Sequence, residues 1–598
     1  AACGGGSSNQ ATYSFVYSAD PNTLDYIAAT RTTTSDVTSN LVDGLLENDQ
    51  YGNFVPSLAE DWTVSEDGLT YTYKLRKGVK WYTSDGEEYA EVTAKDFVTG
   101  LKHAADTNSE AIYLLQNSVK GLNDYLSGAN KDFSNVGIKA VDDYTLQYTL
   151  SQPEPYWNSK MTYSLFWPVN EEFLKSKGDS FGKSTDPSSI LYNGPYILKS
   201  LTAKSSIELT KNENYWDKKN VHFDAIKLSY YDGSDQESHV RNFTDGAYSQ
   251  ARLYPTSSNF NSVEKQYKDN IFHTQPSADI GGVGVNIDRQ SYNHTSKKTD
   301  AEKDSTKKAL LNKDFRQSVN FAIDRTAYSA QLNGEKGAAL AVRNLLVKPD
   351  FVYAGDKSFG DLVTEKMPSY GDEWSGVNLK DSQDGLFNAE KAKTEFAKAK
   401  EALQGEGVQF PIHLDLPVDQ AAKPTVARAQ SLKQSVEKTL GKENVVVDVH
   451  QMSQDDLLNS TLYAANAAAE DWDINISVAW APDYEDPSTF LDIFKTTASE
   501  NTKTYMGFDD PNNAAAAQVG LKDFDALVDN AAKETSDLNV RYERYAEAQA
   551  WLEDSSLFMP LMVNKGAAPM VARLTPFSGA YSQVGPKGSD RYFKYLEP

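Results

Sequence analysis

The spacing of hydrophobic and polar residues along the chain predicts a structure built from both strands and helices. Residues 69–81, LTYTYKLRKGVKW, place Tyr71, Tyr73 and Leu75 at every second position, with Thr or Lys between them. A period of two is typical of a strand with one buried face. The Lys-Gly pair that follows predicts a turn after this strand.

The segment VTAKDFVTGLKHAAD shows the helical period instead. Thr93 and Asp96 fit a capping box at the start of a helix, and the helical spacing then puts Phe97, Leu101 and Ala104 on one face. Similar spacing predicts further helices over 315–325, 388–405 and 538–555.

Three predicted strands alternate with two predicted helices between residues 408 and 480. The strands are VQFPIHLDL, NVVVDVHQ and WDINISVAW; the helices are TVARAQSLKQSVEKTLG, which ends at Gly441, and MSQDDLLNSTLYAAN. Parallel strands need crossover connections, so this order predicts a largely parallel sheet covered by helices. Ligands of such sheets bind beyond the carboxyl ends of the strands, which makes AWAPDYEDPSTFL, with Asp483, the first candidate site.

Composition narrows the class of protein. The 598 residues are too many for one core, so we expect two or three domains. With 39% hydrophobic and 11% aromatic residues the chain is globular. Its net charge of −25 argues against a nucleic-acid partner, which needs a basic face, and no apolar run reaches the length of a membrane span.

No motif nominates a catalytic or metal centre. The seven histidines are not clustered as metal ligands would be. GDSFGKST, residues 178–185, leaves three residues between its glycines where a phosphate loop has four, and GGVGVNIDR lacks the third glycine of a dinucleotide fingerprint. No G-x-S-x-G elbow occurs. We therefore expect no cofactor and no metal, and a binding protein rather than an enzyme.

Cys3 is the only cysteine, which excludes an internal disulfide framework. Ala-Ala-Cys is the end of a bacterial lipobox, and GGGSSNQ reads as a flexible tether. We expect cleavage before Cys3, diacylglycerol on its thiol and anchoring by acyl chains. The alternative is a surface thiol in a flexible terminus.

Most of the aromatic residues should pack in cores, but Tyr and Trp also suit pockets for chemically varied ligands because they join an apolar face to a polar tip. By position along the chain, the candidates for such a pocket are Trp157, Trp167, Trp480 and Tyr484.

Several separated segments resemble one family, the peptide-binding lipoproteins of ABC importers, which are extracytoplasmic solute-binding proteins of family 5. These segments are the block from FVPSLAEDW to VTAKDFV, LYNGPYIL, IELTKNENYWD, LNKDFRQSVNFAIDR and VAWAPDYEDPSTFL. The overall texture is closest to the streptococcal Ami/Ali group. The resemblance implies a monomeric extracellular lipoprotein of a Gram-positive cell, held on the outer face of the cytoplasmic membrane by lipid on Cys3. It would capture oligopeptides and deliver them to an ABC transporter permease.

The resemblance also implies a fold: an α/β, two-lobed, periplasmic-binding-protein-like flytrap of type II, cluster C, with an extra subdomain inserted in the first lobe. Closure of the lobes would be a hinge motion driven by the ligand. The implied segments are 1–10 for the lipid-anchor tether, 11–47, 178–283 and 560–598 for lobe I, 48–177 for the inserted subdomain, and 284–559 for lobe II.

By the family pattern, Asp483 receives the α-ammonium of a peptide in the cleft between the lobes. The implied ligand-binding residues are Asp483, Trp480, Ala481, Tyr484 and, by a looser match, Tyr113. Pro482 has no N–H, so Ala481 must supply any backbone bond there. From the residues alone, Asp483 could equally cap the turn in PDYEDP.

Arginine pairs carboxylates bidentately, so Arg31, Arg241 and Arg343 are candidates for the peptide carboxylate, although surface ion pairs are the commoner fate. Two alternatives to an oligopeptide receptor stay open. One is a receptor of the same fold for a narrow signalling peptide or another solute, and the other is a surface adhesin or enzyme. Peptide length, sequence preference and the identity of the permease also stay open.

Overall fold

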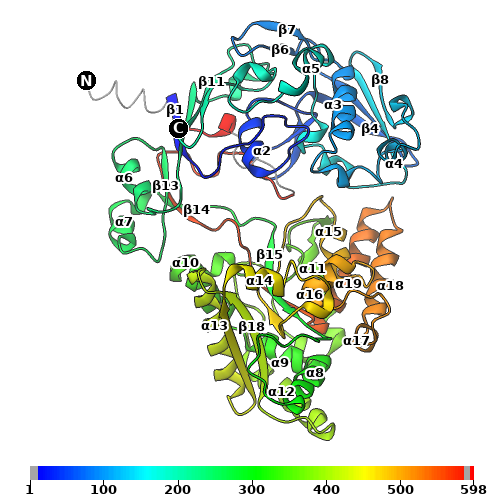
Figure 1. The fold of residues 1–598 in the computed structure, drawn as a ribbon, viewed down its shortest axis with the longest axis vertical. Coiled ribbons are helices and arrows are strands. Elements are labelled where there is room, and N and C mark those ends of the chain that lie inside the picture. Colours follow the sequence, from blue (N-terminus) through cyan, green and yellow to red (C-terminus); the bar gives the residue numbers. More distant parts are fainter. Residues whose placement is uncertain (1–10, 585–592) are drawn as a thin grey trace. The chain divides into compact units, whose positions relative to one another are not determined.

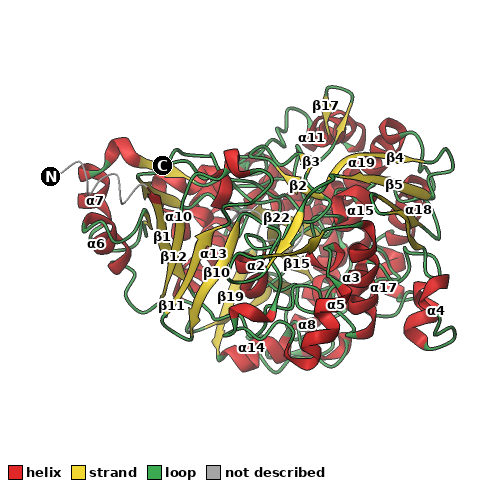
Figure 2. Cartoon of the chain, turned by 90° about the horizontal axis from the view of Figure 1, so that it is seen from above, coloured by secondary structure: helices red, strands yellow, loops and turns green. Residues whose placement is uncertain are grey.

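The computed structural model describes residues 11–584 and 593–598, and the chain is mixed α/β (Figure 2). It divides into two compact units, Ala1–Thr274 with Pro569–Pro598, here called unit 1, and Gln275–Ala568, here called unit 2. The predicted lobe boundaries at 283/284 and 559/560 stay predictions. Cys3 and the whole of the predicted tether, residues 1–10, lie outside the described residues.

Unit 1 contains several small sheets (Figure 1). One has the order β1 (Thr12–Tyr17), β12 (Ala225–Tyr230), β11 (Ser206–Lys211), β10 (Tyr196–Thr202). Another has the order β4 (Ala59–Val64), β5 (Thr70–Leu75), β9 (Thr145–Thr149), β8 (Ile138–Asp142). The shorter ones are β13 (Gln250–Arg252) with β23 (Pro569–Ala572) and β14 (Ile271–His273), β2 (Leu46–Asn48) with β3 (Phe54–Pro56), and β6 (Lys80–Tyr82) with β7 (Glu88–Glu91).

The patterns that predicted a strand and a helix in unit 1 are confirmed. In β5, Tyr71, Tyr73 and Leu75 are buried, as the alternation predicts. The helix α3 (Ala94–Asp106) starts at Thr93 with the expected capping box. The other α-helices among the described residues of unit 1 are α2 (Thr32–Thr38), α4 (Leu122–Ser127), α5 (Glu171–Lys177), α6 (Ser238–Thr244) and α7 (Phe260–Gln266).

Unit 2 consists of short sheets with helices packed around them. Its strands are β15 (Ile280–Val285), β16 (Tyr353–Ala354), β17 (Lys357–Ser358), β18 (Ile412–Asp419), β19 (Val445–Met452), β20 (Ile474–Asn475), β21 (Ala479–Trp480) and β22 (Phe558–Met562). Its helices are α8 (Asp300–Leu311), α9 (Lys313–Ala322), α10 (Arg325–Ala341), α11 (Phe359–Lys366), α12 (Ala389–Gly405), α13 (Lys423–Leu440), α14 (Gln454–Ser460), α15 (Ser488–Leu491), α16 (Ser499–Met506), α17 (Ala514–Gln518), α18 (Leu521–Ala532) and α19 (Leu538–Ser555). Within this unit α15, α16 and α19 gather at one end and α8, α9 and α12 at the other (Figure 1).

The predicted helix ends in unit 2 are confirmed for α12, α13 and α19, whereas the helix predicted over 315–325 ends at Ala322 as α9 and a new helix, α10, begins at Arg325. Asn388 caps α12 with its side chain, and Gly441 is the C-cap of α13, where its φ of 89° suits a residue without a Cβ. The helix α19 covers the predicted residues 538–555. By contrast, α14 is only Gln454–Ser460, shorter than the predicted 452–466.

The predicted βαβαβ order is confirmed for its first two strands and wrong for the third. β18 and β19 pair in parallel around the α13 crossover. The segment WDINISVAW is not one strand but β20 and β21, separated where the Asn475 side chain accepts the N–H of Ser477 at 2.8 Å. Both pieces pair antiparallel with β15. The local pattern could not show this, because β15 comes from a distant part of the chain.

Candidate functional site

The candidate site is the segment from Trp480 to Thr489, which we call the 480–489 loop. Trp480 pairs with Ile280 of β15, so the loop leaves from a short strand edge, and it ends inside α15. Prolines at 482 and 487 restrict the backbone of the residues before them to extended conformations. The loop therefore has a well-defined path even before its side chains are considered.

Thr489 fastens the two ends of this loop to each other. Its hydroxyl accepts the main-chain N–H of Asp483 at 2.9 Å, and its carbonyl accepts the indole N–H of Trp480 at 2.8 Å. Its own N–H donates to the carbonyl of Asp486 at 3.1 Å. Thr489 is buried, so these bonds form away from competing water.

A buried ion pair fixes the loop to α19. The guanidinium of Arg541 donates to both carboxylate oxygens of Asp486, each at 2.8 Å, and both side chains are nearly inaccessible to solvent. Arg541 also donates to the carbonyls of Ala532 and Glu534, which follow or end α18. Because a bidentate pair sets orientation as well as distance, the position of Asp486 is determined by two helices.

The strand that leads into the loop is held in the same way. The hydroxyl of Tyr505, on α16, donates to the carbonyl of Ala479 at 2.9 Å. Further upstream, the Asp473 N–H donates to the carbonyl of Asp415 in β18 at 3.1 Å, and the Asp473 carboxylate binds the buried ammonium of Lys297. The backbone before and after residues 480–483 is therefore anchored to the unit 2 core.

Burial dominates the electrostatics beneath the loop. Burial raises the pKa of Glu485 to about 7, although the charge of Lys348 opposes the rise. Burial also raises the pKa of Asp492 to about 6 and the pKa of Tyr484 well above its usual value. Two carboxyl groups with raised pKa values thus lie close in sequence to Asp483, a pattern found often at binding and catalytic sites.

Comparison with known proteins identifies the family. The family of bacterial extracellular solute-binding proteins, family 5, middle region, matches residues 53–502. The oligopeptide-binding protein AmiA of Streptococcus pneumoniae is 69% identical over 100% of this chain and 91% of its own length. The chain is a family 5 solute-binding protein.

A second relative agrees with this assignment, and a solved structure shows the same fold. The oligopeptide-binding protein SarA of Streptococcus gordonii is 61% identical over 98% of the chain and 88% of its own length. The crystal structure of the substrate-binding domain of an oligopeptide ABC transporter from Bacillus anthracis has a TM-score of 0.61, with 24% identity, and covers 98% of each chain. The predicted fold class, α/β and two-lobed, is thereby confirmed, and family membership confirms a binding protein rather than an enzyme.

In this family 5 protein, four of the predicted ligand-binding residues share the 480–489 loop. Ala481 is exposed, and Trp480, Asp483 and Tyr484 are half-buried. The fifth, Tyr113, is 55% exposed in unit 1, on the short 3₁₀ turn Ile112–Leu114.

Asp486 caps the end of the turn in PDYEDP, and the alternative of a turn-capping role for Asp483 stays open beside a ligand role. The N–H of Ser488 donates to the Asp486 carboxylate at 3.2 Å, and the Ser488 hydroxyl also donates to it. The assignment of Asp483 as a ligand residue stays a prediction.

The other aromatic candidates lie in the core of unit 1. Trp157 is fully buried against the rings of Tyr148 and Phe166, and Trp167 is buried as well. Both side chains therefore pack in the core and do not line a pocket.

The three candidate arginines all have carboxylate partners within the protein. Arg31 and Arg241 form exposed ion pairs, with Glu110 at 2.8 Å and with Asp235 respectively. Arg343 differs from this expectation, because it is buried, with Asp381 at 3.2 Å and the carbonyl of Asp279 at 2.6 Å. Arg343 is thus part of the unit 2 core rather than a surface salt bridge.

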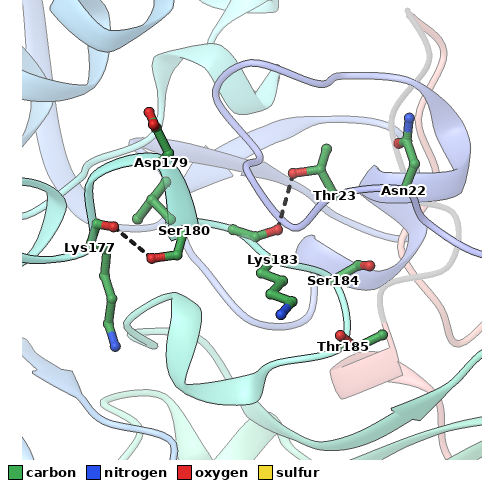
Figure 3. A pocket seen from close by; sticks show the side chains of 10 residues that line it. Asn22, Thr23, Lys177, Asp179, Ser180, Lys183, Ser184 and Thr185 are labelled. Atoms are coloured by element: carbon green, nitrogen blue, oxygen red, sulfur yellow. Dashed lines mark hydrogen bonds between the residues drawn. The ribbon is translucent and has the colours of Figure 1, made fainter.

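A separate cavity of about 700 Å³ opens in unit 1 at the GDSFGKST segment (Figure 3). Asn22 and Thr23 form one wall, and residues 177 and 179–185 form the rest. The Thr23 hydroxyl donates to the carbonyl of Gly182 at 3.1 Å, and the Ser180 hydroxyl to that of Lys177 at 2.7 Å. The side chains of Lys177 and Lys183 end apart from each other in this view (Figure 3).

Residues 11–584 and 593–598 contain neither a cluster of metal-ligating side chains nor a helix suited to span a membrane. No group of three or more His, Cys, Asp or Glu side chains in this part of the chain could hold a metal ion. None of its helices combines the length and apolarity needed to cross a bilayer.

Sequence reasoning missed the residues that support the loop, namely Thr489, Asp486 and Arg541. Thr489 and Asp486 lie in the segment that was singled out, but nothing in the pattern distinguishes them from other turn residues. Arg541 is 55 residues from Asp486, and only the fold brings the two together.

Proposed function

We propose that this family 5 protein captures oligopeptides outside the cell and delivers them to the permease of an ABC importer. The observation that carries the proposal is the 480–489 loop, which holds half-buried Asp483 beside Trp480 on a backbone fastened by buried side chains. The relatives AmiA and SarA, both described as oligopeptide-binding proteins, support the same ligand class.

Recognition of many peptide sequences requires contacts with groups that all peptides share. We assign the α-ammonium to the carboxylate of Asp483 and main-chain hydrogen bonding to Ala481, because Pro482 cannot donate. Trp480 and Tyr484 supply apolar faces with polar tips, which tolerate varied side chains. Tyr113 stays a predicted ligand residue in unit 1.

The lipid anchor belongs to the same proposal. Diacylglycerol on Cys3, with the tether of residues 4–10, would keep the protein at the outer face of the membrane as a monomer. The proposed domain assignment is unchanged. Lobe I consists of residues 11–47, 178–283 and 560–598 with the inserted subdomain 48–177, and lobe II consists of residues 284–559.

Native mass spectrometry of the protein, extracted from membranes without denaturation, tests ligand and anchor together. We expect a ladder of additional masses that fragment as short peptides, on a chain that begins at Cys3 with a diacylglycerol adduct. A single bound mass would favour a narrow signalling-peptide receptor. An unmodified thiol at Cys3 would contradict the anchor.

Asp483→Asn tests the ammonium site. Removal of one partner from a desolvated charge pair costs about 2–5 kcal/mol, so binding of free peptides should weaken about 30-fold or more. Peptides with an acetylated N-terminus lack the ammonium and should change little. Isothermal titration calorimetry with matched free and acetylated peptides measures the difference.

The control for this experiment is Asp455→Asn, a similar change at an exposed position in the first turn of α14. It should leave both affinities unaltered. Equal losses for free and acetylated peptides in the Asp483 variant would rule out Asp483 as the ammonium partner.

A further inference from the structure

We propose that Thr489 is the positioning residue for Asp483 and thereby a determinant of selectivity for peptides with a free N-terminus. This inference rests on the proposed function of the 480–489 loop. Thr489 is 4% exposed and bonds to three residues of the loop, Trp480, Asp483 and Asp486.

The bond from the Asp483 N–H to the Thr489 hydroxyl is the one that sets the aspartate backbone. Pro482 has no N–H, so Asp483 provides the first main-chain donor after Ala481. Fixing this donor at 2.9 Å from a buried hydroxyl limits rotation of the peptide plane that carries the Asp483 Cα. The carboxylate is then presented from a constant origin, and less ordering is required when a ligand binds.

Thr489 is itself held firmly enough to act in this way. Its neighbours Phe490 and Leu491 are fully buried, and the ring of Phe490 packs edge-on against Phe351 at 5.3 Å. Its N–H donates to the carbonyl of Asp486, whose carboxylate is gripped by Arg541. The path from α19 to Asp483 therefore consists of contiguous buried contacts.

The side chain and main chain of Thr489 have separable roles. Trp480 bonds to the carbonyl, which every residue type retains, whereas Asp483 bonds to the hydroxyl. Thr489→Val keeps the shape and the carbonyl and removes the hydroxyl that accepts the Asp483 N–H. The substitution thus isolates one link.

We expect Thr489→Val to weaken binding of free peptides about 5- to 10-fold, because the backbone at Asp483 must then be ordered when the peptide binds. Acetylated peptides should lose less than half as much on the logarithmic scale, and Thr489→Ser should restore the wild-type preference. Calorimetry with matched free and acetylated peptides gives both affinities. Amide hydrogen exchange at Asp483 should be faster in the valine variant than in the wild type.

A matched control is Thr306→Val in α8. The hydroxyl of buried Thr306 donates to the carbonyl of His413 at 2.9 Å, at the end of unit 2 opposite α15 (Figure 1). This variant loses a comparable hydrogen bond, so its thermal unfolding should shift similarly while the ratio of free to acetylated affinity stays constant. If Thr489→Val does not fold, Thr489→Ala serves the same purpose with less steric demand.

The outcomes separate this inference from the function on which it rests. A large effect of Asp483→Asn together with unchanged binding in Thr489→Val would overturn the role of Thr489 and leave the function standing. Equal losses for free and acetylated peptides in Thr489→Val would mean a purely structural role and would also overturn it. If Asp483→Asn weakens the binding of free and acetylated peptides equally, Asp483 is not the ammonium site and the proposal on which this inference rests fails.

Discussion

Two polar loops of the molecule differ in what lies beneath them. The loop of residues 177–185 in unit 1 borders a cavity, but the side chains of Asp179, Lys183 and Thr185 are exposed. The 480–489 loop in unit 2 is supported by buried Asp486 and Thr489. In the first loop, the hydroxyls of Thr23 and Ser180 donate to main-chain carbonyls, whereas the second loop is held by a buried ion pair.

The difference teaches that a cavity alone is a poor guide to a binding site. Affinity and selectivity depend on groups held in place before the ligand arrives, because ordering them afterwards consumes binding free energy. Buried polar side chains hold residues 480–489 in this way, whereas the loop of residues 177–185 is supported by the apolar packing of Phe181. On this ground the 480–489 loop, rather than the cavity in unit 1, is the candidate site.

The largest effect is expected from breaking the buried ion pair between Arg541 and Asp486. Arg541→Met leaves the carboxylate of Asp486 buried without its partner, which typically costs about 3–5 kcal/mol. The denaturant midpoint of unit 2 unfolding should fall accordingly. The matched change in the other loop, Lys183→Met, concerns an exposed side chain and should alter stability by no more than about 0.5 kcal/mol.

Denaturant unfolding followed by tryptophan fluorescence measures both variants. If Arg541→Met does not fold, Arg541→Lys keeps the charge, loses the bidentate geometry and should show a smaller loss in the same direction. Similar stability of the Arg541→Met and Lys183→Met variants would show that the two loops are supported equally, contrary to the comparison.

A smaller effect concerns pH. Folding raises the pKa of Glu485 from 4.5 to about 7, so the folded state holds this proton more tightly than the unfolded state. That stabilisation is complete below about pH 4.5 and is lost as pH rises through about 7. Glu485→Gln removes the cost of ionising this buried carboxyl in the folded state. The free energy of unfolding of the variant, relative to wild type, should therefore rise by up to about 3 kcal/mol between pH 4.5 and pH 8.

Asp186, which follows the unit 1 loop, supplies a control with the opposite sign. A hydrogen bond from the Ser188 hydroxyl lowers the pKa of Asp186, so its stabilisation is present above the unfolded pKa and is lost only in acid. The stability difference between wild type and Asp186→Asn should therefore be constant from pH 5 to pH 8. A flat profile for Glu485→Gln over the same range would contradict burial of that carboxyl.

Much of the local structure was predictable because its causes are local. The capping box at Thr93, the alternation of Tyr71 and Tyr73, and the glycine at 441 each act within a few residues. The sequence also predicted that Asp483 follows the end of a strand. That prediction needed only the last residues of WDINISVAW, which form β21 and end at Trp480.

The prediction of a single third strand failed for the opposite reason. Whether 472–480 forms one strand or two depends on β15, which begins at Ile280, and on the side chain of Asn475. A periodicity within nine residues carries no information about a partner so far away. The same limit hid Arg541, since a charged residue on a helix is normally read as solvated.

The sequence by itself determined the family, the class of fold, most helix ends and the segment that contains the candidate site, because these follow from motifs and short-range spacing. Only the tertiary structure decided how that segment is held: Thr489 beneath Asp483, and Arg541 on Asp486. The physical reason is that buried hydrogen bonds and ion pairs join residues by proximity in space, and desolvation gives them their strength only after the chain has packed.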